Sequence, residues 1–93
     1  MLERDVEKHL TRAVRKRGGM CLKFTSPGTN GVPDRLILLS GGKAGFVETK
    51  APGRKPRPLQ LARHKQFADL GHPVHIIDHP NQIDGVLDEI QTA

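Results

Sequence analysis

Residues 31–50, GVPDRLILLSGGKAGFVETK, contain two strand-like runs separated by a glycine-rich turn. The runs are DRLILL (34–39) and AGFVETK (44–50), and the connection Ser40-Gly41-Gly42-Lys43 is typical of a β-hairpin. The four consecutive apolar residues 36–39 predict a strand that is covered on both faces and is therefore central in its sheet. This hairpin decides the fold, because the remaining elements must pack around it.

The length of the turn decides which side chains share a face of the hairpin. A three-residue turn places Asp34 directly opposite Glu48, with Cβ atoms about 5 Å apart. A two-residue turn would move Glu48 to the other face, because a one-residue slip inverts every side chain. We predict the three-residue turn, with Leu39 opposite Lys43, and Lys50 then joins the face of the two acids.

Two ionised carboxylates this close repel each other unless a cation lies between them. Carboxylate oxygens without nearby cysteines favour Mg²⁺ or Mn²⁺ over zinc, and such an ion can polarise a phosphodiester. Lys50 would orient or deprotonate an attacking water, or stabilise charge on phosphorus. The simpler alternatives are a surface ion cluster at the end of a hairpin, and an Asp34 that only closes the preceding loop.

The segments on either side of the hairpin predict three helices and two more strands. Leu2, Val6, Leu10, Ala13 and Val14 recur at helical spacing and predict an amphipathic helix over 2–17 with a basic outer face. MCLKF (20–24) and PVHIID (73–78) are strand-like. A stiff loop (51–58) precedes a helix that begins at Pro58.

For the helix that begins at Pro58 we expect a buried stripe of Leu59, Ala62, Phe67 and Leu70. A last helix is entered through Pro80. The order is helix, three strands, helix, strand and helix, which predicts a single α/β domain over residues 1–93 with a mixed sheet and helices on its faces.

Composition favours a polyanionic partner. The chain has a formal net charge of +5 and a pI near 9.9, and its only aromatic residues are three Phe. This balance favours nucleic acid bound through its phosphates. A thin core makes a homodimer plausible, and a single cysteine with no signal peptide or apolar span places the protein in the cytoplasm, away from membranes.

GVPDR, FVETK and PLQLARHKQFADLG followed by PVHIID together resemble the virus-type replication-repair nuclease (VRR-NUC) family of the PD-(D/E)XK superfamily, in its short stand-alone form. The resemblance implies a restriction-endonuclease-like α-β-β-β-α-β core plus a C-terminal helix. It also implies a Mg²⁺- or Mn²⁺-dependent DNA endonuclease, in which Asp34 and Glu48 bind the metal and Lys50 is the catalytic lysine.

Further site residues are implied by the same resemblance. The backbone carbonyl of Thr49 would be another metal ligand, and Gln60 would lie near the metal or the scissile phosphate, although a neutral surface role for Gln60 stays open. A glutamate of the first helix completes such sites. Glu3 and Glu7 compete for that role with equal support, and either could instead only favour the first turn of its helix.

The loop after Lys50 supplies the predicted DNA contacts. Arg54, Lys55 and Arg57 leave the end of the strand that carries Lys50, so we expect them to bind the DNA backbone. Lys23 and Ser26, which precede the Asp34 strand, are weaker candidates for phosphate contacts. We expect a structural role for Arg35 and a solvated side chain for His64.

The leading hypothesis is a structure-selective endonuclease that works as a homodimer on branched DNA, such as four-way junctions, in replication, repair or recombination. One alternative is a catalytically silent DNA-binding accessory module with the same fold. Another is a sequence-specific restriction-type enzyme, for which the chain has little room.

Overall fold

The elements follow the predicted order along the chain. The computed structural model describes residues 1–93. Its elements are α1 (Glu3–Lys16), β1 (Met20–Lys23), β2 (Arg35–Leu39), β3 (Lys43–Thr49), α2 (Pro58–Asp69), β4 (Val74–Ile77), a short 3₁₀ turn η1 (Pro80–Gln82) and α3 (Ile83–Thr92). No helix is both long enough and apolar enough to span a membrane.

The four strands form one mixed sheet in the order β1-β2-β3-β4. β1, β2 and β3 pair antiparallel, whereas β4 runs parallel to β3. The predicted register of the hairpin is confirmed, because Leu39 pairs with Lys43 and Leu36 pairs with Phe46. The turn between them is made by Gly41 and Gly42, whose φ angles of 77° and 73° suit glycine and few other residues.

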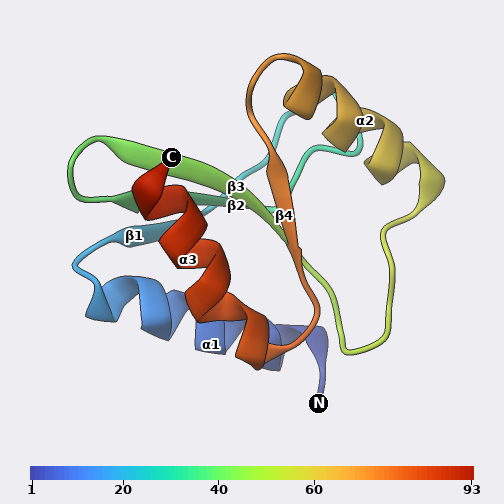
Figure 1. Ribbon diagram of the computed structural model, residues 1–93. Helices are drawn as coiled ribbons and strands as arrows, with labels where there is room; N and C mark the ends of the chain where they lie inside the picture. The colour runs from blue at the N-terminus through green and yellow to red at the C-terminus, as the bar shows by residue number, and fades with distance from the viewer.

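The hydrophobic core lies between one face of the sheet and the helices α1 and α3 (Figure 1). All three elements present aliphatic side chains to it at the spacing that their secondary structure requires. The buried apolar residues are Val6, Leu10 and Val14 of α1, Ile37, Leu39, Val47 and Ile77 of the sheet, and Ile83, Leu87 and Ile90 of α3. α1 and α3 are thereby fixed against each other and against the sheet.

The other face of the sheet is only partly covered, which corrects one prediction. β2 is internal in the sheet as expected, but its burial alternates: Ile37 is fully buried, whereas Leu36 and Leu38 are half-buried. Figure 1 shows why, since α2 lies beyond β4, away from α1 and α3. The apolar run 36–39 therefore predicted correctly that β2 is internal in the sheet. It predicted wrongly that both faces of β2 are buried.

The buried stripe predicted for α2 is wrong. Leu59 and Leu70 are 52% and 78% exposed, and Ala62 is exposed as well. Phe67 is half-buried, with its ring centroid 5.1 Å from that of Phe46 on β3. The one buried residue of α2 is His64, for which we expected a solvated side chain. α2 packs through an aromatic contact and through polar side chains, and its leucines face outward.

Helix α3 packs closely on β3 at Gly45. A Cβ atom at this position would lie 2.6 Å from Cγ1 of Ile90, well inside van der Waals contact. At Gly85, within α3 itself, an added Cβ atom would meet nothing within 4 Å. The two glycines therefore differ in why they are present: one permits packing, and the other only weakens its helix.

We expect Gly45→Ala to lower the free energy of unfolding by about 1–3 kcal/mol, because the added methyl group displaces Ile90 from a packed core. Gly85→Ala should raise it by about 0.5–1 kcal/mol, since Ala stabilises an exposed helical position relative to Gly. Urea unfolding followed by circular dichroism measures both. Equal effects of the two substitutions would contradict the close packing at Gly45.

Candidate active site

Asp34 is fixed at the end of the sheet by β3. Its Oδ1 accepts a hydrogen bond from the Thr49 N–H (3.1 Å), and its Oδ2 accepts one from the Thr49 hydroxyl (2.7 Å). The Asp34 carbonyl accepts a further bond from the Phe24 N–H (2.9 Å). The β2–β3 ladder ends at the Arg35–Val47 pair, directly before Asp34 and Glu48, so the predicted register carries both acids to the same end of the sheet.

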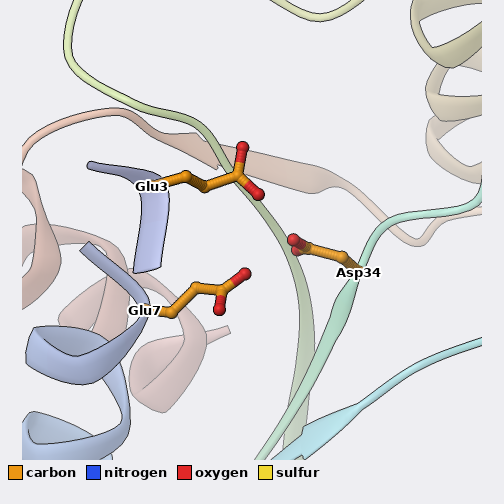
Figure 2. A group of neighbouring side chains, drawn as sticks. All are labelled: Glu3, Glu7 and Asp34. Carbon is orange, nitrogen blue, oxygen red and sulfur yellow. The ribbon is translucent and has the colours of Figure 1, made fainter. Parts of the chain in front are cut away.

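Two glutamates of α1 join Asp34. One carboxylate oxygen from each of Glu3, Glu7 and Asp34 lies within 4.8 Å of the other two, and Figure 2 shows the two glutamates reaching from successive turns of α1 toward Asp34. We call these three side chains the acid cluster. Glu7 is also held by Arg35, whose guanidinium lies 3.4 Å from Oε2. Both candidates from the first helix therefore reach Asp34, and only Glu7 is anchored by a buried cation.

Glu48 is buried beside the acid cluster and has its own partners. Its side chain is 4% exposed, and Gln60 Nε2 donates to Oε2 at 3.1 Å. Lys50 Nζ lies 3.5 Å from the same oxygen, as the two-residue period predicts. Gln60 also accepts from the Arg57 N–H at 2.9 Å, which fixes it in the first turn of α2. The structure thus brings Gln60 and Lys50 to Glu48.

His64 is a further residue at this site. Its Nε2 lies 3.6 Å from Glu48 Oε1, and its side chain is 8% exposed. Glu48 Oε1 and both ring nitrogens of His64 are buried without a hydrogen-bond partner. His64 follows Gln60 by one helical turn, so the spacing places both on one face of α2. The sequence spacing therefore indicated that His64 lies on the same side of α2 as Gln60. The prediction that its side chain is solvated is wrong.

We expected the backbone carbonyl of Thr49 to bind a metal ion, and the structure shows a different role for its N–H and hydroxyl groups. Its N–H and hydroxyl both bond Asp34, and the hydroxyl also lies 3.3 Å from Glu7 Oε1. A hydroxyl has one proton, and the shorter distance assigns it to Asp34. The ligand role of the Thr49 carbonyl stays a prediction.

The electrostatics of the site favour binding of a cation. Burial, and next to it the charge of Asp34, raise the pKa of Glu48 to about 7. Burial also raises the pKa of Asp34, against the two hydrogen bonds from Thr49, and raises the pKa of Glu3, assisted by the charges of Asp34 and Glu7. Burial lowers the pKa of His64, so the ring carries less charge to offset the acids. Negative charge is concentrated here beyond what Lys50 and Arg35 neutralise.

The donor set fits a hard divalent ion. The acid cluster offers oxygen ligands only, which Mg²⁺ and Mn²⁺ prefer, and Glu48 Oε1 is a buried carboxylate oxygen with no hydrogen bond. Burial and, after it, the charges of neighbouring acids raise the pKa values of these groups, and a cation among them would favour their ionised forms.

The predicted DNA-binding residues lie close to the site, with one exception. Arg54, Lys55 and Arg57 line a hollow of about 380 Å³ together with Glu3 and Lys50. Ser26 lines a second hollow, of about 640 Å³, whose other wall is the start of α2 including Arg57. Lys23 is exposed on β1, lines neither hollow and forms no ion pair. The loop after Lys50 thus lies beside Glu3 and Lys50, and the loop after β1 lies beside Gln60.

This arrangement defines the class of the protein: an α/β domain of the restriction-endonuclease-like type, with carboxylates and a lysine gathered at one end of a mixed sheet. No family model matches the sequence. A solved structure described as a VRR_NUC domain matches the fold with a TM-score of 0.84 and 32% identity, covering 92% of this chain and 94% of that one. The chain belongs to the VRR-NUC family.

A curated relative points the same way. The chain is 55% identical over 76 residues to "Putative nuclease p44" of Acyrthosiphon pisum secondary endosymbiont phage 1, and the match covers 82% of each chain. The expected resemblance and the expected fold are confirmed.

The raised pKa of Glu48 gives the metal-free protein a specific pH dependence. A carboxyl whose pKa rises from 4.5 to about 7 on folding binds its proton more tightly in the folded state. The free energy of unfolding should therefore fall as pH rises from about 4.5 to about 7 and level off above, by at most about 1.4 kcal/mol per pH unit for this group.

Glu48→Gln should make that fall shallower, because the amide does not ionise, although Asp34 and Glu3 contribute in the same direction. Asp69→Asn, on the exposed surface of α2, is the control and should keep the wild-type slope. Denaturant unfolding in EDTA between pH 4 and pH 8.5 measures it. A Glu48→Gln profile that matches the wild type would show that folding does not raise the pKa of Glu48.

Proposed function

We propose that the protein is a metal-dependent DNA endonuclease that hydrolyses phosphodiester bonds at the acid cluster. The observation that carries this proposal is the convergence of Asp34, the glutamates of α1 and Glu48 at one end of the sheet, with Lys50 3.5 Å from Glu48. Membership of the VRR-NUC family and the name of the phage relative support a nuclease.

Asp34, Glu7 and Glu48 would hold Mg²⁺ or Mn²⁺, with Glu3 and the Thr49 carbonyl as further donors. When bound, the ion supplies Lewis-acid polarisation of the phosphodiester and lowers the pKa of water. Thr49 keeps the Asp34 carboxylate aimed at the site through two hydrogen bonds, and Gln60 does the same for Glu48. Lys50 places a positive charge where negative charge develops on the phosphate.

The basic loop after β3 is the proposed contact to the DNA backbone on one side of the site. Arg54, Lys55 and Arg57 are all exposed, and their hollow includes Lys50 and Glu3. A phosphate held there would lie beside the acids without itself reading the base sequence.

The substrate we propose is branched DNA, such as a four-way junction, cut by a homodimer. Two sites related by a two-fold axis suit a branched substrate better than one small domain does. Exposed large apolar residues give a second copy a surface to cover: Met20 and Leu22 on the edge strand β1, and Leu59, Leu61 and Leu70 on or directly after α2. The rival function is a silent DNA-binding module, against which stands the full set of Asp34, Glu48 and Lys50.

Asp34→Asn should reduce cleavage below detection and leave DNA binding within about tenfold of the wild type, because it removes a metal ligand and no phosphate contact. Labelled duplex, flap and four-way-junction DNA incubated with Mg²⁺, Mn²⁺ or EDTA measure cleavage and substrate preference together. Asp69→Asn, which removes the same charge from the far surface of α2, should cut like the wild type.

The outcomes separate the hypotheses. Junction cleavage that needs the metal and Asp34 supports the proposal, and equal activity of Asp34→Asn removes Asp34 from the site. Intact binding without cleavage of any substrate by the wild type would favour the silent module. Cleavage of duplex at one sequence only would favour a restriction-type enzyme.

The homodimer is tested separately by light scattering on the protein eluting from a size-exclusion column. We expect a molar mass of twice the 10.3 kDa chain, since the exposed apolar residues of β1 and of the α2 region favour association. A mass of one chain at every concentration up to about 100 µM, a hundred times a micromolar dissociation constant, would contradict it.

A further inference from the structure

The exposed side of α1 carries four cations in a row. Arg4, Lys8, Arg12 and Arg15 follow one another at steps of four, four and three residues, which places them on one face of the helix. At about 1.5 Å of rise per residue the row is about 16 Å long. We call these four residues the α1 stripe. The opposite side of the helix is the buried side, with Val6, Leu10 and Val14.

No member of the α1 stripe forms an ion pair within the protein. The other cations that form ion pairs are Arg17, Arg35, Lys50 and Lys65 together with two histidines, and no member of the stripe is among them. Asp5 lies next to Arg4 in the sequence, but its carboxylate accepts the Leu2 N–H at 2.6 Å. Like charges one helical turn apart destabilise a helix, and within the chain this cost is offset only at one end, where the bond to Leu2 and, after it, the charges of Arg4 and Lys8 lower the pKa of Asp5.

The stripe forms the wall of a hollow rather than a flat surface. The hollow has a volume of about 370 Å³ and is lined by the four stripe residues together with Glu7, Thr11 and Arg35. None of the seven is hydrophobic, and the single acid, Glu7, is paired with Arg35 at 3.4 Å. A site with this lining suits an anion with several oxygens and does not suit an apolar ligand.

The hollow borders the acid cluster, because Glu7 belongs to both. Glu7 lines the hollow and also lies within 4.8 Å of Glu3 and Asp34. Glu3, one turn earlier, lines the hollow of the basic loop that contains Arg54 and Arg57. The acids therefore lie between two basic hollows, one on α1 and one on the loop after β3, and Figure 2 shows the two glutamates side by side on α1.

We propose that the α1 stripe is a second binding site for the phosphodiester backbone, which holds the DNA on the side of the acid cluster opposite the 51–57 loop. The inference rests on the proposed nuclease function for the identity of the anion. Bound at both hollows, one strand would pass over the acids between them. An anionic membrane is the less suitable partner, because the apolar side of α1 is in the core and no apolar residue borders the stripe's hollow.

The test is the salt dependence of DNA binding by the full chain. Lys8→Gln, Arg12→Gln and the double variant are compared with Lys65→Gln, which removes one exposed cation from α2. A fluorescent four-way junction in EDTA, which prevents cutting, is titrated at 50–200 mM KCl. Each stripe substitution should reduce the slope of log K against log salt by about 0.9, and the double variant by about twice that.

Lys65→Gln should keep the wild-type slope, and all variants should keep the wild-type circular dichroism, since every substituted side chain is exposed. Stripe variants with the wild-type slope would overturn the proposal. The proposal would also be overturned if the stripe variants bound DNA normally and lost binding to vesicles that contain 30% phosphatidylserine. The readout does not depend on cleavage: a wild type that binds with the predicted slopes but never cuts would refute the nuclease function and leave the stripe standing.

Discussion

The two hydrogen bonds from Thr49 to the Asp34 carboxylate are the contact on which the site depends. They join the start of β2 to the end of β3 beyond the last pair of the ladder, at distances of 3.1 and 2.7 Å. Without them the carboxylate of Asp34 would be free to turn to water. The Thr49 N–H lies beyond the last pair of the β2–β3 ladder and has no strand partner there, and it orients the Asp34 carboxylate instead.

Holding several acids close together in a partly buried site costs free energy, and several elements of the structure share in holding them. Burial opposes ionisation of Asp34 and Glu48, and the acids repel one another, so each is held by a different element. β3 holds Asp34, α2 holds Glu48 through Gln60, and β2 holds Glu7 through Arg35. Functional sites commonly lower the stability of the protein that carries them. Here the aliphatic core between α1, α3 and the sheet supplies compensating stability.

The sequence predicted much of this because the decisive features are local. The hairpin register follows from the length of one turn, and it carries Asp34 and Glu48 to the same end of the sheet, where Lys50 lies 3.5 Å from Glu48. The order of elements follows from apolar periodicity and from glycine and proline punctuation. The choice between Glu3 and Glu7 could not be made in this way, because one helical turn leaves both within reach of Asp34.

The sequence could not predict which side chains of α2 are buried, and the reason is a different one. Leucine spacing indicated a candidate buried face for α2, but the cover of a helix depends on how far it sits from the sheet, and that distance is a tertiary property. Leu59 is half-exposed and His64 is buried, because Gln60 and His64 turn toward Glu48. The contacts of Gln60 and His64 with Glu48 and the packing of Phe67 on Phe46, rather than the leucines, fit the observed orientation of this helix.

The thin attachment of α2 has a consequence for how the molecule fluctuates. Local stability follows buried apolar contact, and this helix contributes none of the ten core side chains. We therefore expect α2 to open more readily than α1 and α3, and opening would remove Gln60 and His64 from Glu48 and expose it to water. Such an opening would leave Asp34, Glu3 and Glu7 in place, because β3, β2 and α1 hold them without any contact from α2.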